Sequence, residues 1–177
     1  MADRAGRIAA SLDSVHESLR MVQRELSCVD TDDARWRWAA VGLVIALQGA
    51  LVTALSGYET ATDADVEDPS SPEQFAPVAL LLRRARSTEY LNAPERVEIT
   101  GSMLHQIERL VTYRNMVVHG LGVIDGEGVS KGCQKVLGVV RHVVLAHPAF
   151  DVSRHHLVCT LISDEISRIE RLLRAHG

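Results

Sequence analysis

The sequence predicts an all-α protein, an up-and-down bundle of about five to six helices. Hydrophobic residues make up 46% of the chain but aromatic residues only 4%, and a core of small aliphatic side chains favours helices over strands. Apolar residues also recur every three or four positions over long segments, which is the period of an α-helix. No segment carries a convincing strand pattern.

The chain length, the net charge and the cysteine content restrict the class of protein. We expect one domain over residues 1–177, because a chain of this length can bury a complete core. The three cysteines are an odd number without a CxxC pair, and the charged N-terminal segment lacks the apolar stretch of a signal peptide. These features favour a cytoplasmic protein. The formal net charge of −4 excludes a broadly basic surface, so a contact with a phosphate backbone is expected only in a local cleft.

The N-terminal region, residues 1–33, is predicted to contain one helix. Its apolar residues are spaced four, three, four, three and four positions apart: Ile8, Leu12, Val15, Leu19, Val22 and Leu26. This spacing keeps one apolar seam on one face, which we interpret as core packing rather than as a free coiled-coil surface. The segment Cys28–Asp33 breaks the helix, and Asp32 or Asp33 is expected to cap the next one.

The second helix is predicted over Ala34–Leu55 and is apolar around most of its circumference. Its uncharged part, Ala39–Leu55, is shorter than the ~20 residues of a membrane span and contains Gln48, so we interpret it as a core helix. We expect the five or six helices to leave part of it uncovered and a two-fold interface to cover the rest. Gly42 and Gly49 would let another backbone approach it closely.

The remaining chain is predicted to contain a loop and four more helices. Residues 56–71 are acidic and polar, and we expect a flexible loop within the domain. A tight turn is expected at Asp125–Gly126. The helices are predicted over Pro77–Ser87, Glu95–Val118, Lys131–Ala146 and Ser153–Ala175. The last of them carries a second apolar stripe, formed by Leu157, Leu161, Ile162, Ile166, Ile169 and Leu173.

The segment Tyr113–Gly120 (YRNMVVHG) carries the residues suited to chemistry, at the end of a helix that Gly120 is expected to close. Arginine is charged at any physiological pH, and its planar fork fits phosphate oxygens. Histidine, with an unperturbed pKa of ~6.5, both accepts and donates protons near neutrality. Five residues of separation place Arg114 and His119 about 140° apart on a regular helix. A turn before Gly120, or a symmetric dimer, is expected to bring such pairs together.

Two other interpretations compete for these side chains. An arginine near a helix C-terminus and a histidine before a glycine are also common structural residues of helix ends. A metal site is suggested by His155, His156 and Cys159, but no further ligand completes a zinc pattern, so we expect no metal and no cofactor. The glycine-rich segment after Gly120 lacks the order of a phosphate-binding P-loop.

The motif resembles that of the HEPN superfamily, whose mark is an arginine, a polar residue, three further residues and a histidine. Arg114-Asn115-x-x-x-His119 matches it at every position, and the apolar segment Trp36–Leu55 looks like the second helix of HEPN-like proteins. The resemblance covers Ala34–Leu173. It implies a HEPN-like bundle with Arg114 and His119 as catalytic residues, and Asn115 orienting the histidine or the phosphate.

The same resemblance implies a function. It points to a metal-independent endoribonuclease that leaves 2′,3′-cyclic phosphate ends, acts as a homodimer and serves as a toxin or phage-defence effector. The partners that it implies are RNA, a second copy, and an antitoxin or defence-system protein. The alternative is a non-catalytic HEPN-like module that binds a nucleotide, RNA or protein partner with the same cleft. Some HEPN toxins carry a modifiable tyrosine where this chain has Leu121, so control by tyrosine modification is not expected there.

Overall fold

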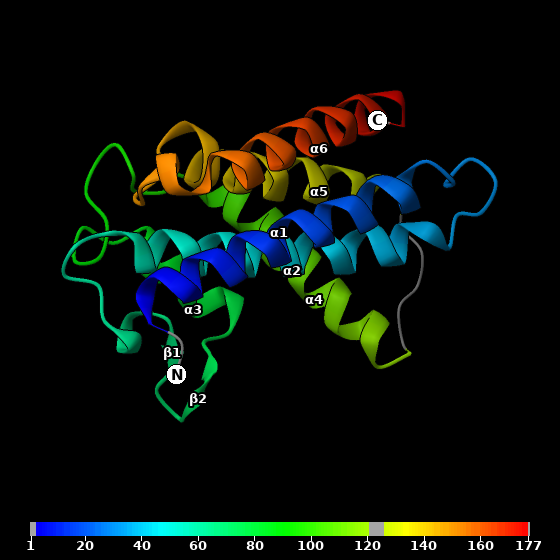
Figure 1. The fold of residues 1–177 in the computed structure, drawn as a ribbon. Helices are drawn as coiled ribbons and strands as arrows, with labels where there is room; N and C mark the ends of the chain where they lie inside the picture. The colour runs from blue at the N-terminus through cyan, green and yellow to red at the C-terminus, as the bar shows by residue number, and fades with distance from the viewer. Residues whose placement is uncertain (1–2, 121–125, 177) are drawn as a thin grey trace.

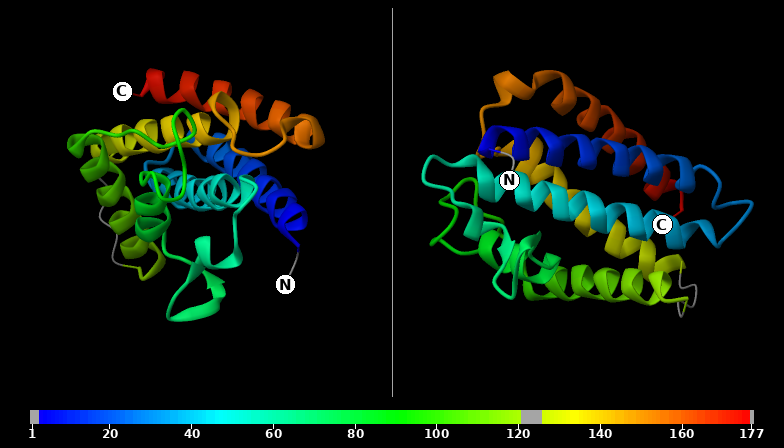
Figure 2. Two further views of the ribbon diagram at one scale, coloured as in Figure 1. Left: turned by 90° about the vertical axis from the view of Figure 1, so that its left-hand side faces the viewer. Right: turned by 60° about the horizontal axis from the view of Figure 1, so that its bottom comes forward.

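The computed structural model describes residues 3–120 and 126–176, which form a helical bundle (Figure 1). The all-α bundle predicted from the sequence is therefore confirmed. Within these residues the α-helices are α1 (Arg4–Leu26), α2 (Arg35–Gly57), α3 (Val78–Ala85), α4 (Gly101–Val118), α5 (Gly126–Arg141) and α6 (His156–Ala175). Figure 2 shows α2 in the middle, with α1 on one side, α3 and α4 on the other, and α5 and α6 layered against them.

Helices α1 and α2 form an antiparallel pair at the centre of the core (Figure 1). The predicted seam of α1 is buried along its whole length, from Ile8 at 6% exposure to Leu26 at 0%. Two glycines of α2 allow the close approach: a Cβ at Gly42 would lie 3.2 Å from the Ser18 carbonyl oxygen, and one at Gly49 3.1 Å from the Ser11 carbonyl oxygen. The backbone that approaches these glycines thus belongs to α1.

The structure corrects the expectation that α2 needs a second subunit to cover it. By length and composition α2 could cross a membrane, but 83% of its most apolar 18-residue window is buried inside the bundle. Residues around its circumference, such as Ala46, Leu51 and Val52, are at most 1% exposed. Helix α2 is therefore a core helix that one chain covers almost completely, and it gives no reason to place a two-fold interface there.

The acidic segment at residues 56–71 has more structure than the sequence suggested. It contains a short 3₁₀ helix, η1 (Asp63–Asp65), and strand β1 (Glu67–Asp68), which pairs antiparallel with β2 (Ser71–Phe75). The expectation that the chain has no strand is wrong. Val66, between η1 and β1, is fully buried and anchors the segment in the core.

Two arginines from neighbouring helices hold this segment. The guanidinium of Arg7 in α1 pairs with the carboxylate of Asp63. Arg84 in α3 donates to the carbonyl oxygens of Asp65 and Glu67, at 3.1 and 3.0 Å. Both arginines are buried, so the acidic stretch satisfies cations that would otherwise lie unpaired in the core.

The helix boundaries differ most from the prediction at α4 and α5. Helix α4 begins at Gly101 rather than near Glu95, and Thr100 caps it by accepting a hydrogen bond from the Met103 amide at 3.2 Å. Helix α5 already begins at Gly126 and continues into a π-helical turn, η2 (His142–Ala146). The turn expected at Asp125–Gly126 falls partly outside the described residues.

Helix α6, which follows the short 3₁₀ helix η3 (Val152–His155), buries only part of its predicted stripe. Ile162 and Ile166 are inaccessible, whereas Leu157 is 73% and Leu161 39% exposed. Leu161 lies five residues before Ile166, which turns it about 140° away from the buried face. The stripe predicted from the sequence therefore merges two different faces of α6.

The three cysteines differ in environment, and none forms a disulfide. Cys133 is completely buried in α5, and this burial raises the pKa of its thiol to about 12. Burial also raises the pKa of Cys159 in α6. Cys28, in the turn between α1 and α2, is partly exposed.

Candidate functional site

The candidate site lies at the C-terminal end of α4, the helix that the bundle covers least. Helix α4 packs against α2 and α5, and only Ile107 and Leu110 of its residues are buried. The contact with α5 is close, since a Cβ at Gly132 would lie 3.2 Å from the Cβ of Leu110. Beyond Leu110 the helix continues toward solvent and carries the motif on its last turn and a half.

Arg114 lies one turn after Leu110 and continues the packing face of α4, which explains why it is half-buried. Its guanidinium Nη1 donates to the Oδ1 atom of Asn115 at 2.9 Å. Its Nε atom is buried without a hydrogen-bond acceptor, and no carboxylate among the described residues pairs with it. Among the described residues Arg114 therefore has no ionic partner, and part of its guanidinium N–H groups have no acceptor.

His119 is the C-cap of α4, with φ −91° and ψ 10°, and Gly120 follows with φ +75°. A positive φ at this position favours glycine, which confirms that Gly120 closes the helix. The Gly120 amide donates to the Val117 carbonyl at 3.0 Å, and this bond tightens the last turn. The imidazole of His119 is exposed, with no hydrogen-bond or ion-pair partner among the described residues.

The structure brings Arg114 and Asn115 together but leaves His119 apart from them. Because α4 stays helical through Val118, the five-residue separation keeps Arg114 and His119 on different faces. The Asn115 amide orients the arginine, and no hydrogen bond joins it to the imidazole among the described residues. One described copy therefore does not assemble the arginine and the histidine into a single site.

Apolar side chains surround the motif on the exposed side of α4. Met116 is 40% and Val118 57% exposed, and both lie between the arginine and the histidine in sequence. They are two positions apart, about 200° around the helix, so they lie on different sides of α4 and do not form one patch. Met116 and His119 are three positions apart and share one face of α4, so the imidazole lies beside Met116, whereas Val118 shares a face with Arg114.

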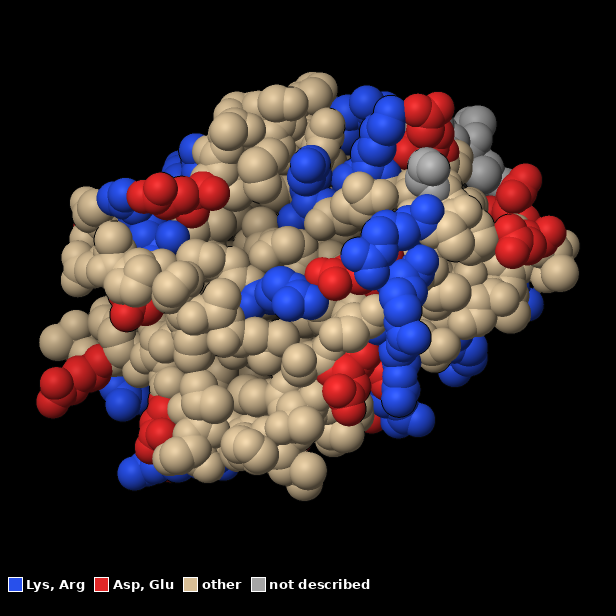
Figure 3. Space-filling view, turned by 90° about the horizontal axis from the view of Figure 1, so that it is seen from above, with Lys and Arg blue, Asp and Glu red and all other residues tan. Residues whose placement is uncertain are grey.

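A basic strip crosses the other side of the molecule, the side seen from above α6 (Figure 3). Carboxylates already neutralise part of the basic charge of α5 and α6: Arg168 pairs with Glu165, and Arg141 with Glu170, each at 3.0 Å. Cations that are already paired bind phosphates less strongly than free ones would. We therefore give the strip no part in the candidate site.

The histidines and the cysteine considered as metal ligands do not converge. The described residues contain no group of three or more histidine, cysteine, aspartate or glutamate side chains placed to hold a metal ion. The ring of His155 instead packs edge-on against Phe150, with ring centroids 5.8 Å apart. Cys159 is buried in the core, so both Cys159 and His155 contribute to packing.

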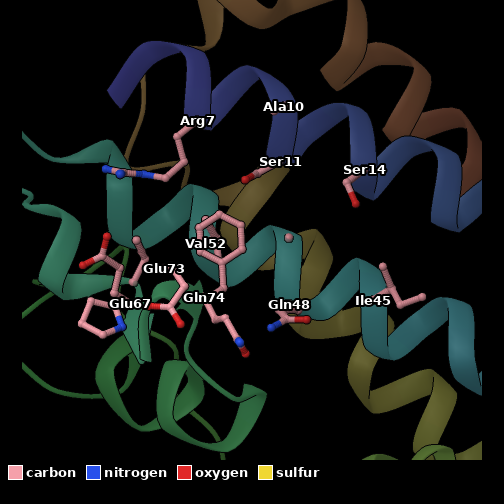
Figure 4. Close-up of a pocket in the computed structure, with 14 residues that line it drawn as sticks. Arg7, Ala10, Ser11, Ser14, Ile45, Gln48, Val52, Glu67, Glu73 and Gln74 are labelled. Carbon is pink, nitrogen blue, oxygen red and sulfur yellow. The ribbon is translucent and has the colours of Figure 1, made fainter. Parts of the chain in front are cut away.

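A cavity of about 340 Å³, which no sequence pattern predicted, lies between α1, α2 and the β1–β2 hairpin (Figure 4). Its walls come from three segments that are far apart in sequence, so no local motif announces it. One available signal was the series of small residues on one side of α1: Ala10, Ser11 and Ser14. A second was Gly49 opposite them on α2, because small side chains leave room between neighbouring helices.

Comparisons with protein-family models, with curated proteins and with solved structures found no match to this chain. The assignment of a function therefore rests on the residues themselves and on their geometry.

Proposed function

We propose that the protein is a metal-independent endoribonuclease of the HEPN type that acts as a homodimer. The observation that carries this proposal is the state of Arg114: Asn115 holds it at the surface, and no carboxylate among the described residues neutralises it. Such a guanidinium suits a phosphate, which accepts two parallel N–H bonds from it. The exposed His119 at the same helix end supplies the proton transfer that RNA cleavage needs.

The proposed reaction is an internal transesterification. The ribose 2′-oxygen forms a bond to phosphorus, and its proton passes to the imidazole of His119. The bond between phosphorus and the 5′-oxygen breaks, and a protonated imidazole or a water molecule supplies the proton that this oxygen gains. Arg114 stabilises the negative charge on the phosphate oxygens in the transition state. The products are a 2′,3′-cyclic phosphate and a free 5′-hydroxyl.

The separation of Arg114 from His119 supports a site shared between two copies. In a symmetric dimer that pairs the ends of α4, the arginine of one copy can lie near the histidine of the other. Met116 and Val118 are the apolar side chains that such a contact would bury. The two-fold interface is therefore proposed at the end of α4 and not on α2.

In the cell, this activity suits a toxin or a phage-defence effector in the cytoplasm, held inactive by an antitoxin or another protein of the same system. Induced expression in bacteria tests this part of the proposal. The wild-type protein is expected to stop growth, and His119→Ala to permit it at equal protein level. Normal growth with the wild-type protein would contradict the role as a toxin.

The decisive experiment incubates purified protein with a mixed RNA pool in EDTA. We expect cleavage with 2′,3′-cyclic phosphate ends, and resistance of a substrate that has 2′-deoxyribose at the cut. His119→Ala is expected to lose the activity. His105→Ala, another exposed histidine of α4, is the matched control and is expected to keep it. Cleavage that requires a metal, or full activity of His119→Ala, would refute the mechanism.

Mixing two inactive variants tests the shared site. Each proposed site combines the arginine of one copy with the histidine of the other. A heterodimer of Arg114→Ala and His119→Ala would therefore contain one intact site and one site that lacks both side chains. Random exchange of subunits would then restore about a quarter of the wild-type activity. A mixture that forms heterodimers without regaining activity would show that each site lies within one copy.

The second candidate is a non-catalytic module that binds RNA, a nucleotide or a protein with the same surface. The observation in its favour is that the described chain does not bring His119 to Arg114. Under this alternative the wild-type protein and both variants leave the RNA pool intact. Arg114→Ala still weakens binding of the partner. The same purified variants thus separate the two functions.

A further inference from the structure

The cavity between α1, α2 and the hairpin lies away from the candidate site and has the form of a ligand pocket. At about 340 Å³ it falls within the range of small-molecule sites, which starts near 300 Å³. Figure 4 shows Ser11 and Ser14 on the α1 side, Glu67, Glu73 and Gln74 on the hairpin side, and Gln48 on α2 between them. The pocket is half-enclosed, so a ligand can enter without unfolding the hairpin.

Apolar side chains form most of the pocket surface. Ile45 and Val52 of α2 and Val66 beside β1 contribute aliphatic walls. Phe75 of β2 also lines the pocket and is 48% exposed. The other phenylalanine of the chain, Phe150, is buried. An aromatic ring left half-exposed at a pocket offers a flat surface for a ring or a cation of a ligand.

The charges at the pocket do not cancel. Arg7 is the one basic residue among its lining, and its guanidinium is already engaged by the carboxylate of Asp63 and by the Ser56 hydroxyl, the latter at 2.9 Å. The lining also contains Glu67 and Glu73, and neither carboxylate forms an ion pair with a described residue. The pocket therefore presents an excess of negative charge beside an apolar surface.

Uncharged polar groups complete the lining. The Nε2 atom of Gln48 donates to the Ala76 carbonyl at 3.2 Å, which leaves its Oε1 atom as an acceptor. The hydroxyls of Ser11 and Ser14 have no hydrogen-bond partner among the described residues. An ammonium group has three donors and no acceptor, so carboxylate, amide and hydroxyl oxygens all suit it.

We propose that this pocket binds a small organic monocation, an amine whose ammonium group is joined by a short alkyl chain to an aromatic or aliphatic ring. The ring lies on the apolar wall formed by Ile45, Val52 and Phe75. The ammonium group lies toward Glu67 and Glu73. The excess of carboxylates argues against anions such as nucleotides, and this pocket is therefore distinct from the proposed RNA site in ligand chemistry as well as in position.

Methyl NMR of the full chain tests the proposal with three probes of similar shape and different charge: 2-phenylethylamine, 2-phenylethanol and phenylacetate. We expect saturable shifts of the Ile45, Val52 and Val66 methyl signals with the amine, at a Kd of about 10 mM or below. One close charge contact in water is equivalent to roughly a fivefold change in affinity, so the amine should exceed the alcohol by at least about this factor. Phenylacetate should bind most weakly.

Two pairs of variants complete the test. Glu67→Gln with Glu73→Gln should reduce amine binding to the level of the alcohol, whereas Glu89→Gln with Glu108→Gln, two exposed carboxylates elsewhere, should leave it unchanged. Ala10→Phe, which fills the pocket from its exposed rim, should abolish binding of every probe, and Ala5→Phe on the same helix should not. Equal binding of amine and carboxylate, or no saturable shift at these methyl groups, would overturn the proposal. Neither result depends on ribonuclease activity.

Discussion

The α1–α2 pair and α4 differ in how completely the bundle covers them. In α2, residues on every side are buried, and α1 adds a seam without exposure from Leu12 to Leu26. In α4 only Ile107 and Leu110 are buried, and the last turns carry exposed apolar and polar side chains. Burial of apolar surface stabilises the fold, so the α1–α2 pair contributes more to the free energy of folding than the end of α4, where the proposed site lies.

The largest expected effect is on activity, at the thinly covered end of α4. His119→Ala should lower the cleavage rate by about 10²–10⁴-fold and leave RNA binding nearly intact, because it removes only proton transfer. Arg114→Lys keeps the charge but loses the planar fork, so it should remain impaired by roughly 10²-fold and also bind RNA more weakly. Single-turnover cleavage and filter binding measure both quantities. Neither variant should lower the thermal midpoint by more than a few degrees, and a collapse of folding would break the comparison.

The next effect is on stability, in the pair. Leu47→Ala in α2 removes a fully buried side chain and should lower the free energy of unfolding by about 2–5 kcal/mol. Val118→Ala in α4, where the side chain is 57% exposed, should change it by less than about 0.5 kcal/mol. Urea unfolding followed by circular dichroism measures both. Equal losses would show that the end of α4 contributes to the core as much as α2 does.

A smaller effect should appear at the close contact between α1 and α2. Gly49→Ala places a Cβ 2.9 Å from a methyl group of Val15 and 3.1 Å from the Ser11 carbonyl oxygen, and should cost about 1–3 kcal/mol. Gly138→Ala in α5 is the matched control, because no atom lies within 4 Å of the new Cβ. It should stabilise the protein by roughly 0.5–1 kcal/mol through helix propensity. If Gly49→Ala also stabilised the protein, α1 and α2 could move apart without a loss of stability, and the close contact would not matter.

The smallest effect concerns the segment that follows α2. The phenol of Tyr58 is partly buried and donates to Asp65 at 3.0 Å, and these two causes raise its pKa to about 12. The unfolded value is near ~10, so the folded chain binds this proton more tightly. The stabilisation is complete below pH ~10 and is lost as the pH rises toward 12. Tyr58→Phe should reduce the pH dependence of the free energy of unfolding between pH ~10 and 12, and the control Tyr90→Phe should not. An unchanged pH dependence in Tyr58→Phe would contradict the raised pKa of Tyr58.

The parts of the molecule that sequence analysis predicted well are those determined by local pattern. The seam of α1 follows from spacing alone, and the close approach at Gly42 and Gly49 follows from the absence of a side chain. Gly120 could be identified as the end of α4 because a positive φ at a helix C-terminus favours glycine. The motif at Arg114 was also placed correctly on the last turns of a helix, although its roles stay predictions.

The parts that it missed depend on partners far away in the sequence. Residues 56–71 look like a loop by composition, and only Arg7 and Arg84, from two other helices, show why this acidic stretch is held in place. The coverage of α2 depends on how α1, α3, α4 and α5 surround it, which no window of sequence contains. The pocket lined by Phe75 could not be inferred for the same reason, since its walls meet only in the folded chain.

The unequal burial of the cysteines makes the chain convenient for spectroscopy without any substitution. Cys133 and Cys159 are buried, and burial raises the pKa of both thiols, so Cys28 is the accessible cysteine. A maleimide dye or nitroxide should therefore attach at one place, the turn between α1 and α2. In a symmetric assembly the two labels would form a single pair, and the distance between them would report on how the copies are arranged.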